Sequence, residues 1–144
     1  MNSEQLVKDE ISITKYVDPN YVEVIGTGAH IPKVIRDGKV AVLYSPGHGA
    51  GWTSWHGVEA LLFDPDVVRW VEEYQALEDK TPEADFDLYT NIEVHCKAKY
   101  PNIYIGGADR LEIMWLPIGT HFRIHEYDGY ETVEVREEIN WSVA

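Results

Sequence analysis

Residues 39–56 read KVAVLYSPGHGAGWTSWH, and this stretch decides how the rest of the chain is interpreted. Residues 40–44 form an apolar run without a charge, which is typical of a buried strand. The proline that follows ends the strand because it lacks a backbone donor. Gly47, Gly49 and Gly51 then allow backbone conformations that other residues avoid. The stretch therefore predicts a central strand that leads into a flexible loop with aromatic flanks.

The glycine-rich loop is the first candidate for a binding site, because a rigid strand that feeds a flexible loop commonly positions functional residues. Successive backbone N–H groups in such a loop can form a nest for an anion, and indole rings can stack on a base. The G-x-G-x-G spacing is neither the G-x-G-x-x-G of a dinucleotide fold nor a P-loop. The predicted ligand-binding residues of the loop are Gly47, His48, Gly49, Gly51, Trp52 and Trp55. The alternative is a tight loop whose tryptophans fill the core.

Cations are scarce in this chain, so an anionic ligand would draw on few side chains. The 144 residues include 12 Lys and Arg against 25 Asp and Glu, which gives a net charge of −13. Arg110 follows a second glycine-rich turn, and that turn could converge on the first. We therefore add Arg110 and Arg36 to the predicted ligand-binding residues. A surface salt bridge between Arg110 and Asp109 or Glu112 is the competing interpretation.

The acidic charge also limits the classes of partner. It opposes nonspecific attraction to nucleic-acid phosphates and to anionic membranes, so we predict neither as a partner. Its simplest role is solubility, and imitation of DNA is less favoured because the acids do not lie in a regular row. No apolar run approaches about 20 residues and the N-terminus lacks a signal pattern, so neither a membrane span nor standard secretion is expected. The single Cys96 predicts a reducing compartment.

The patterning predicts one α+β domain over residues 1–144, with a mostly antiparallel sheet and two helices. An aspartate followed by a proline predicts the start of a helix over about 65–79. A threonine followed by a proline predicts a second helix over about 82–98, with apolar residues at every fourth position. Within it, the alternation of Ile92, Val94 and Cys96 leaves a strand as the alternative.

Shorter elements are predicted from alternating apolar residues and turn signals. Strands are expected at residues 11–17, 21–25, 103–105 and 111–115, and a loop is expected at 26–32. Trp141 is expected to pack back on the body of the protein.

The strongest turn signal is Asp128-Gly129, which predicts a C-terminal β-hairpin. In a two-residue turn Tyr127 faces Tyr130, and counting outward places Ile124 opposite Val133 and Phe122 opposite Val135 on the core face. The other face pairs His125 with Thr132, Arg123 with Glu134, and His121 with Arg136. The basic row on that face could bind an anion or a metal, but cross-strand stabilisation is the better explanation.

Catalytic and metal-binding interpretations of the loop are less favoured. Ser45 or Ser54 could act as a nucleophile with a nearby histidine as base, but the Gly-x-Ser-x-Gly elbow is missing. His48 and His56 could bind a metal with an aspartate of residues 64–66, but their separation matches no standard ligand spacing. We therefore predict no catalytic residue, no metal and no cofactor.

Several motifs are distinctive as a set: KVAVLYSPG at 39–47, GAGW at 49–52, LFDP at 62–65, GGAD at 106–109, WLPIGTHFRI at 115–124 and EYDG at 126–129. Together they resemble a family of small proteins encoded by phages of Gram-positive bacteria. The resemblance covers about residues 39–144 and implies a phage gene product that acts in the host cytoplasm.

Small accessory phage proteins often counter host defence, and one class consists of oligomeric sponges that sequester nucleotide-derived immune signals. The chain is similar to that class in size and in its aromatic, glycine-rich loops. The resemblance therefore implies a homo-oligomer that holds a small anionic, nucleotide-like ligand without catalysis. A small hydrolase for a nucleotide-like substrate and an acidic protein that inhibits a host macromolecule are the alternatives.

Overall fold

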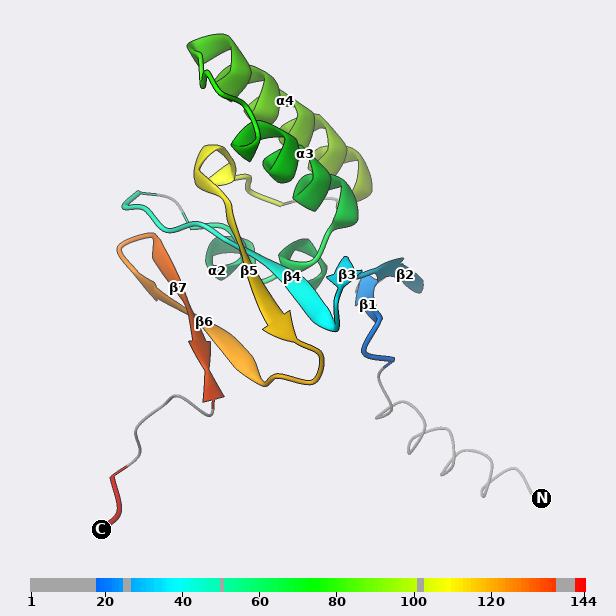
Figure 1. The fold of residues 1–144 in the computed structure, drawn as a ribbon, viewed down its shortest axis with the longest axis vertical. Coiled ribbons are helices and arrows are strands. Elements are labelled where there is room, and N and C mark those ends of the chain that lie inside the picture. The colour runs from blue at the N-terminus through cyan, green and yellow to red at the C-terminus, as the bar shows by residue number, and fades with distance from the viewer. Residues whose placement is uncertain (1–17, 25–26, 50, 101–102, 137–141) are drawn as a thin grey trace, which may run out of the picture.

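The centre of the fold is an antiparallel sheet with the strand order β3–β4–β5 (Figure 1). The computed structural model describes residues 18–24, 27–49, 51–100, 103–136 and 142–144. Strand β4, Lys39–Tyr44, pairs along its whole length with β5, Glu112–Pro117, and its first residues pair with β3, Ile35–Arg36. Residues 40–43 of β4 are buried, which confirms the buried central strand predicted from the apolar run.

A two-stranded sheet precedes the central one. Strand β1, Tyr21–Val24, pairs antiparallel with β2, Ala29–Pro32. The prediction of a loop over 26–32 was therefore wrong at its C-terminal end, because pairing with β1 buries Ile31 in the core. The strand predicted at 103–105 does not form either: Ile105 is buried, but this segment pairs with no described strand. The predictions for residues 11–17 and Trp141 lie outside the described residues.

Two long helices lie side by side over one end of the central sheet (Figure 1). Helix α3 is Pro65–Gln75 and α4 is Pro82–Lys99, so both predicted helices are confirmed. Helix α3 ends earlier than predicted, and the Lys80 ammonium donates to the carbonyls of Gln75, the last residue of the helix, and of Leu77, just after it.

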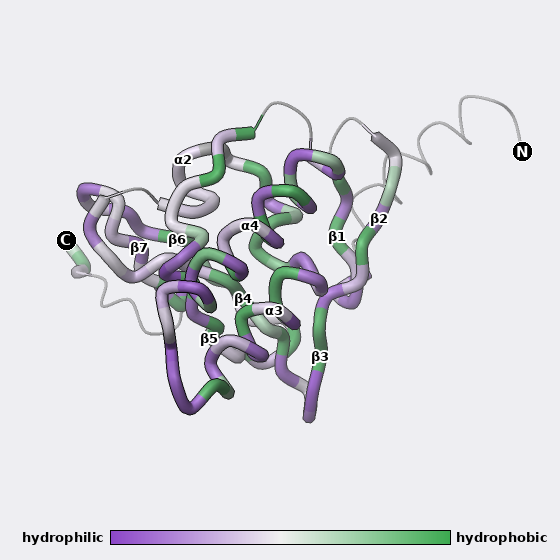
Figure 2. The backbone as a smooth tube through the Cα atoms, turned by 90° about the horizontal axis from the view of Figure 1, so that it is seen from above, coloured by the Kyte–Doolittle hydropathy of each residue, from purple (hydrophilic) through white to green (hydrophobic). Residues whose placement is uncertain are grey.

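The burial pattern of α4 decides between the helix and the alternative strand for this segment. Leu88, Ile92 and Cys96 are buried at four-residue spacing, whereas Val94 is 63% exposed, so the alternation toward a strand has no structural counterpart. Hydrophobic and hydrophilic segments alternate along both long helices (Figure 2). In α3 this matches a single face packed on the core, where Val67, Val68 and Val71 are buried. Among the described residues, no helix is both long and apolar enough to cross a bilayer.

Three short helical segments complete the connections between the sheets and the long helices. Helix α2 is Thr53–His56, and the 3₁₀ turns η1 and η2 are Glu59–Leu62 and Ala108–Arg110. Helix α2 and η1 connect the glycine-rich loop to the start of α3.

The C-terminal hairpin forms as predicted. Strand β6, Phe122–Tyr127, pairs with β7, Tyr130–Val135, in the register counted from the Asp128-Gly129 turn. Its inner face carries Val133 and Val135, and in the same alternation it also carries Glu131, which is fully buried.

The tip of this hairpin packs against the glycine-rich loop. The Gly49 N–H donates to the Asp128 carbonyl at 3.1 Å. Gly129 has φ +81°, and a Cβ added there would lie 1.6 Å from the Gly49 carbonyl oxygen. The two segments, distant in sequence, therefore meet backbone to backbone, and only glycine fits at the contact.

Substitution of Gly129 by alanine tests this contact. Gly38 is a matched control, because it closes the other Asp-Gly turn with φ +74° and an added Cβ there meets nothing within 4 Å. Gly38→Ala should cost about 1–2 kcal/mol of unfolding free energy from backbone strain alone. Gly129→Ala should cost at least about 2 kcal/mol more, because the loop must move. Equal costs in urea unfolding would contradict the contact.

Candidate functional site

The glycine-rich loop is held by a buried carboxylate from the hairpin. Glu131 is fully buried, and its Oε1 accepts from the Ser45 N–H at 2.9 Å. Its Oε2 accepts from the N–H groups of Trp52 at 2.8 Å and Ser54 at 3.0 Å, and also from the Ser54 hydroxyl. The anion at this loop is therefore a side chain of the same molecule, and its backbone donors are Ser45, Trp52 and Ser54 at the two ends of the loop, not the predicted glycine amides.

Two glycine amides of the loop are also engaged within the protein. The Gly47 N–H donates to the Ser45 carbonyl at 3.1 Å, and the Gly49 N–H donates to Asp128. An external anion at this loop would therefore have to compete with these acceptors for the two amides.

The two tryptophans predicted to stack on a base differ in burial. Trp52 is fully buried, and its indole N–H donates to the Leu61 carbonyl at 2.9 Å, so it fills the core. Trp55 is 51% exposed and stacks on Tyr104, with ring centroids 5.9 Å apart and an interplanar angle of 24°. Tyr104 is itself 59% exposed. The structure thus presents one of the two indoles on the surface.

Only one of the two arginines predicted to bind the ligand lies at the loop. The exposed Arg110 side chain lies against the loop, where it donates to the His48 carbonyl and would contact a Cβ added at Gly47 or Gly49. Arg36 lies at the other end of β4, beside Lys39. It forms a bidentate ion pair with Glu72, with N–O distances of 2.5 and 2.8 Å. The structure therefore brings Arg110 to the loop and keeps Arg36 away from it.

The exposed residues of the loop and its neighbours form what we name the aromatic loop surface. Its members are His48, Trp55, Tyr104, Arg110 and Tyr130. The rings of His48 and Tyr130 lie 5.3 Å apart, so the hairpin contributes to this surface as well as to its support. Sequence reasoning missed Tyr104 and Tyr130, which only the tertiary fold brings to the loop.

Sequence reasoning also missed Glu131, although a signal for it was present. The predicted hairpin register places Glu131 on the face that carries Val133 and Val135. A charged residue in line with core positions requires buried hydrogen-bond donors nearby.

The serines of the loop are not arranged as nucleophiles. Ser45 is fully buried, and its hydroxyl has no hydrogen-bond partner among the described residues. The Ser54 hydroxyl donates to Glu131. Burial also raises the pKa of the Cys96 thiol to about 12, which keeps it protonated. A serine activated by a histidine is therefore not found among the side chains that the structure describes.

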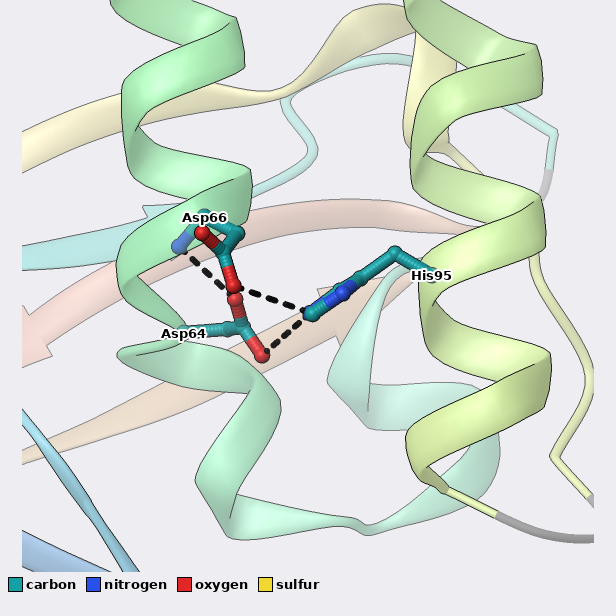
Figure 3. A group of neighbouring side chains, drawn as sticks. All are labelled: Asp64, Asp66 and His95. Atoms are coloured by element: carbon teal, nitrogen blue, oxygen red, sulfur yellow. Dashed lines mark hydrogen bonds and ion pairs between the residues drawn. The ribbon is translucent and has the colours of Figure 1, made fainter.

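A second polar cluster joins the start of α3 to α4. Figure 3 shows the His95 imidazole pointing from α4 toward Asp64 and Asp66, and one ligand atom from each of the three residues lies within 4.8 Å of the others. Asp64 is fully buried and caps α3 by accepting from the N–H groups of Asp66 and Val67.

The donors around Asp64 favour a hydrogen-bond network over a metal centre. Its Oδ2 accepts from the Tyr100 hydroxyl at 2.6 Å and lies 3.0 Å from His95 Nε2. The Lys99 ammonium lies 3.8 Å from the same oxygen, and its charge would repel a divalent cation. The cluster therefore ties the two helices together.

The basic row on the outer face of the hairpin is exposed, and its arginine is paired across the strands. Arg123 Nε lies 2.7 Å from Glu134 Oε2. This ion pair is the cross-strand interaction that the hairpin register predicted.

Comparisons of the chain with protein-family models, with curated proteins and with solved structures found no match.

Substitution of Glu131 tests the anchoring of the loop. Glu131→Gln places an amide donor among backbone N–H groups, so we expect a loss of about 2 kcal/mol or more in the free energy of unfolding. Glu134→Gln, on the outer face of the same strand, removes only a partly exposed ion pair and should cost less than about 1 kcal/mol. Similar losses for both variants would contradict the anchoring role.

The acid stability of the protein tests the Asp64 network. Burial by itself raises the pKa of the Asp64 carboxyl, but hydrogen bonds from Tyr100 and His95 outweigh it and hold that pKa below its usual range. The stabilisation is therefore present above the ordinary value of about 3.9 and is lost as the pH falls through the lower folded value.

Asp64→Asn keeps a good helix cap and removes only the charge. We expect it to lower the free energy of unfolding by about 2 kcal/mol at neutral pH, with the gap from wild type closing below about pH 4. Asp87→Asn, at an exposed position of α4, is the control and should change stability by less than about 0.5 kcal/mol. A gap for Asp64→Asn that stays constant from pH 7 to pH 2 would contradict the account.

Proposed function

We propose that this protein binds a small anionic, nucleotide-like ligand at the aromatic loop surface and holds it without changing it. One observation carries the proposal: an exposed arginine and a half-exposed indole lie on glycines of the same loop. Arg110 contacts the Gly47 and Gly49 positions, and Trp55 contacts the Gly51 position. The pair thus offers a cation for a phosphate and a π face for a base on adjacent parts of one surface.

The chemistry of these two side chains supports this ligand class. A guanidinium has five N–H donors, so donation to the His48 carbonyl leaves donors for a phosphate oxygen. Tyr104 stacks against the Trp55 indole and braces it, while about half of that side chain stays exposed. The proposed ligand is therefore bound by side chains and not by the backbone N–H groups of the loop, and the loop backbone supports these side chains.

The resemblance to phage proteins carries the rest of the proposal. It supports a homo-oligomer that acts in the host cytoplasm and sequesters a nucleotide-derived immune signal. The Ser54 hydroxyl donates to Glu131 and the Cys96 thiol is protonated, so neither is arranged as a nucleophile. This favours sequestration over hydrolysis.

Thermal unfolding with cyclic nucleotides and ADP-ribose derivatives tests the proposal. A ligand that binds the folded state well above its Kd must raise the midpoint. Trp55→Ala and Arg110→Met should each weaken binding by roughly tenfold or more, because stacking and charge-assisted contacts are each worth about 1–3 kcal/mol. The controls Phe86→Ala and Arg69→Met remove an exposed aromatic and an exposed arginine elsewhere and should leave binding unchanged.

No midpoint shift with any of these compounds would contradict the proposal, and so would equal effects of the test and control variants. Ligand recovered intact after denaturation supports sequestration, whereas a changed product indicates the hydrolase alternative. A salt-sensitive complex with a host macromolecule, without ligand binding, would indicate the acidic-surface alternative.

A further inference from the structure

A cavity apart from the aromatic loop surface lies between the central sheet, the start of β6 and the segment after β2. Its volume is about 430 Å³, and none of its lining residues belongs to the aromatic loop surface. The residues that matter to its chemistry are Lys33, Val40, Val42, Phe63, His121 and Phe122. It is therefore a separate site with its own composition.

The walls of this cavity are apolar. Val40 and Val42 contribute the sheet side, and the rings of Phe63 and Phe122 meet edge to face with centroids 6.2 Å apart. Apolar walls with a few convergent polar groups are the usual composition of a small-molecule site. The body of a ligand that fits here is hydrocarbon.

Lys33 is the lysine that lines this cavity. The Lys33 ammonium lies 4.5 Å from the Phe63 ring centroid, and Lys33 takes part in none of the ion pairs formed by the described residues. Burial lowers the pKa of Lys33, and the negative charges of Glu59 and Asp18 oppose that shift. In a chain with 25 acidic residues, a partly buried lysine that forms no ion pair with a carboxylate of the described residues is a position that an external anion can fill.

The polar groups at the cavity suit a single negative charge. Besides Lys33, the residues that line it include Thr120 and His121, whose side chains are of types that donate hydrogen bonds to a carboxylate. We infer that this cavity binds a small molecule with an apolar body and one carboxylate, and that the carboxylate pairs with the Lys33 ammonium. This site is independent of the proposed nucleotide-like ligand, so either can fail without the other.

Titration of the full-length chain with octanoate, octanamide and acetate tests the inference. Octanoate carries both features, octanamide lacks the charge and acetate lacks the apolar body. We expect octanoate to bind about tenfold or more tightly than either, because a charge-assisted pair adds to apolar burial. Backbone amide NMR signals of residues 40–42 and 118–122 should shift, and those of residues 47–55 should not.

Variants of Lys33 separate the charge from the fold. Lys33→Met should reduce octanoate affinity about tenfold, to the level of octanamide, and leave octanamide affinity unchanged. Lys33→Arg should retain octanoate binding, and Lys97→Met, at an exposed lysine of α4, should behave as wild type. Equal affinities for octanoate and octanamide, shifts elsewhere in the protein, or no binding to the wild-type chain would overturn the inference.

Discussion

The hydrogen bonds to the buried carboxylate of Glu131 are the constraint on which the rest of the site depends. Ser45, at the end of the central strand, and Trp52 and Ser54, at the start of α2, all donate to this one side chain from the hairpin. A buried carboxylate is costly unless it is fully hydrogen-bonded, so the loop and hairpin are stable only together. Glu131 thus fixes where the loop begins, where it ends and what lies beneath it.

This anchoring explains how the loop divides its residues between support and surface. The backbone amides near Glu131 and the Trp52 indole face inward and are hydrogen-bonded within the protein. Trp55 and Arg110 remain on the outside, braced by Tyr104 and by the loop backbone. Such a rigid support is the condition under which a few exposed side chains can hold a ligand in one orientation.

Much of the fold was predictable because its signals are local. Helix caps, the Asp-Gly turns and the apolar run of β4 each act within a few residues, and the hairpin register followed by counting. The pairing of β1 with β2 and the approach of Tyr104 to Trp55 depend on tertiary contacts that no local pattern contains. The sequence indicated the loop but not Glu131 as its anchor. A glutamate is normally expected on the surface, and only its position on the inner face of the hairpin indicates otherwise.

Amide hydrogen exchange in the native protein measures most directly whether Glu131 holds the loop. If it does, the amides of Trp52 and Ser54 exchange as slowly as that of Val42 in the central strand, because all three open only when the hairpin and sheet come apart. Exchange of the Trp52 and Ser54 amides at the rate of an unstructured chain, while Val42 stays protected, would contradict this account.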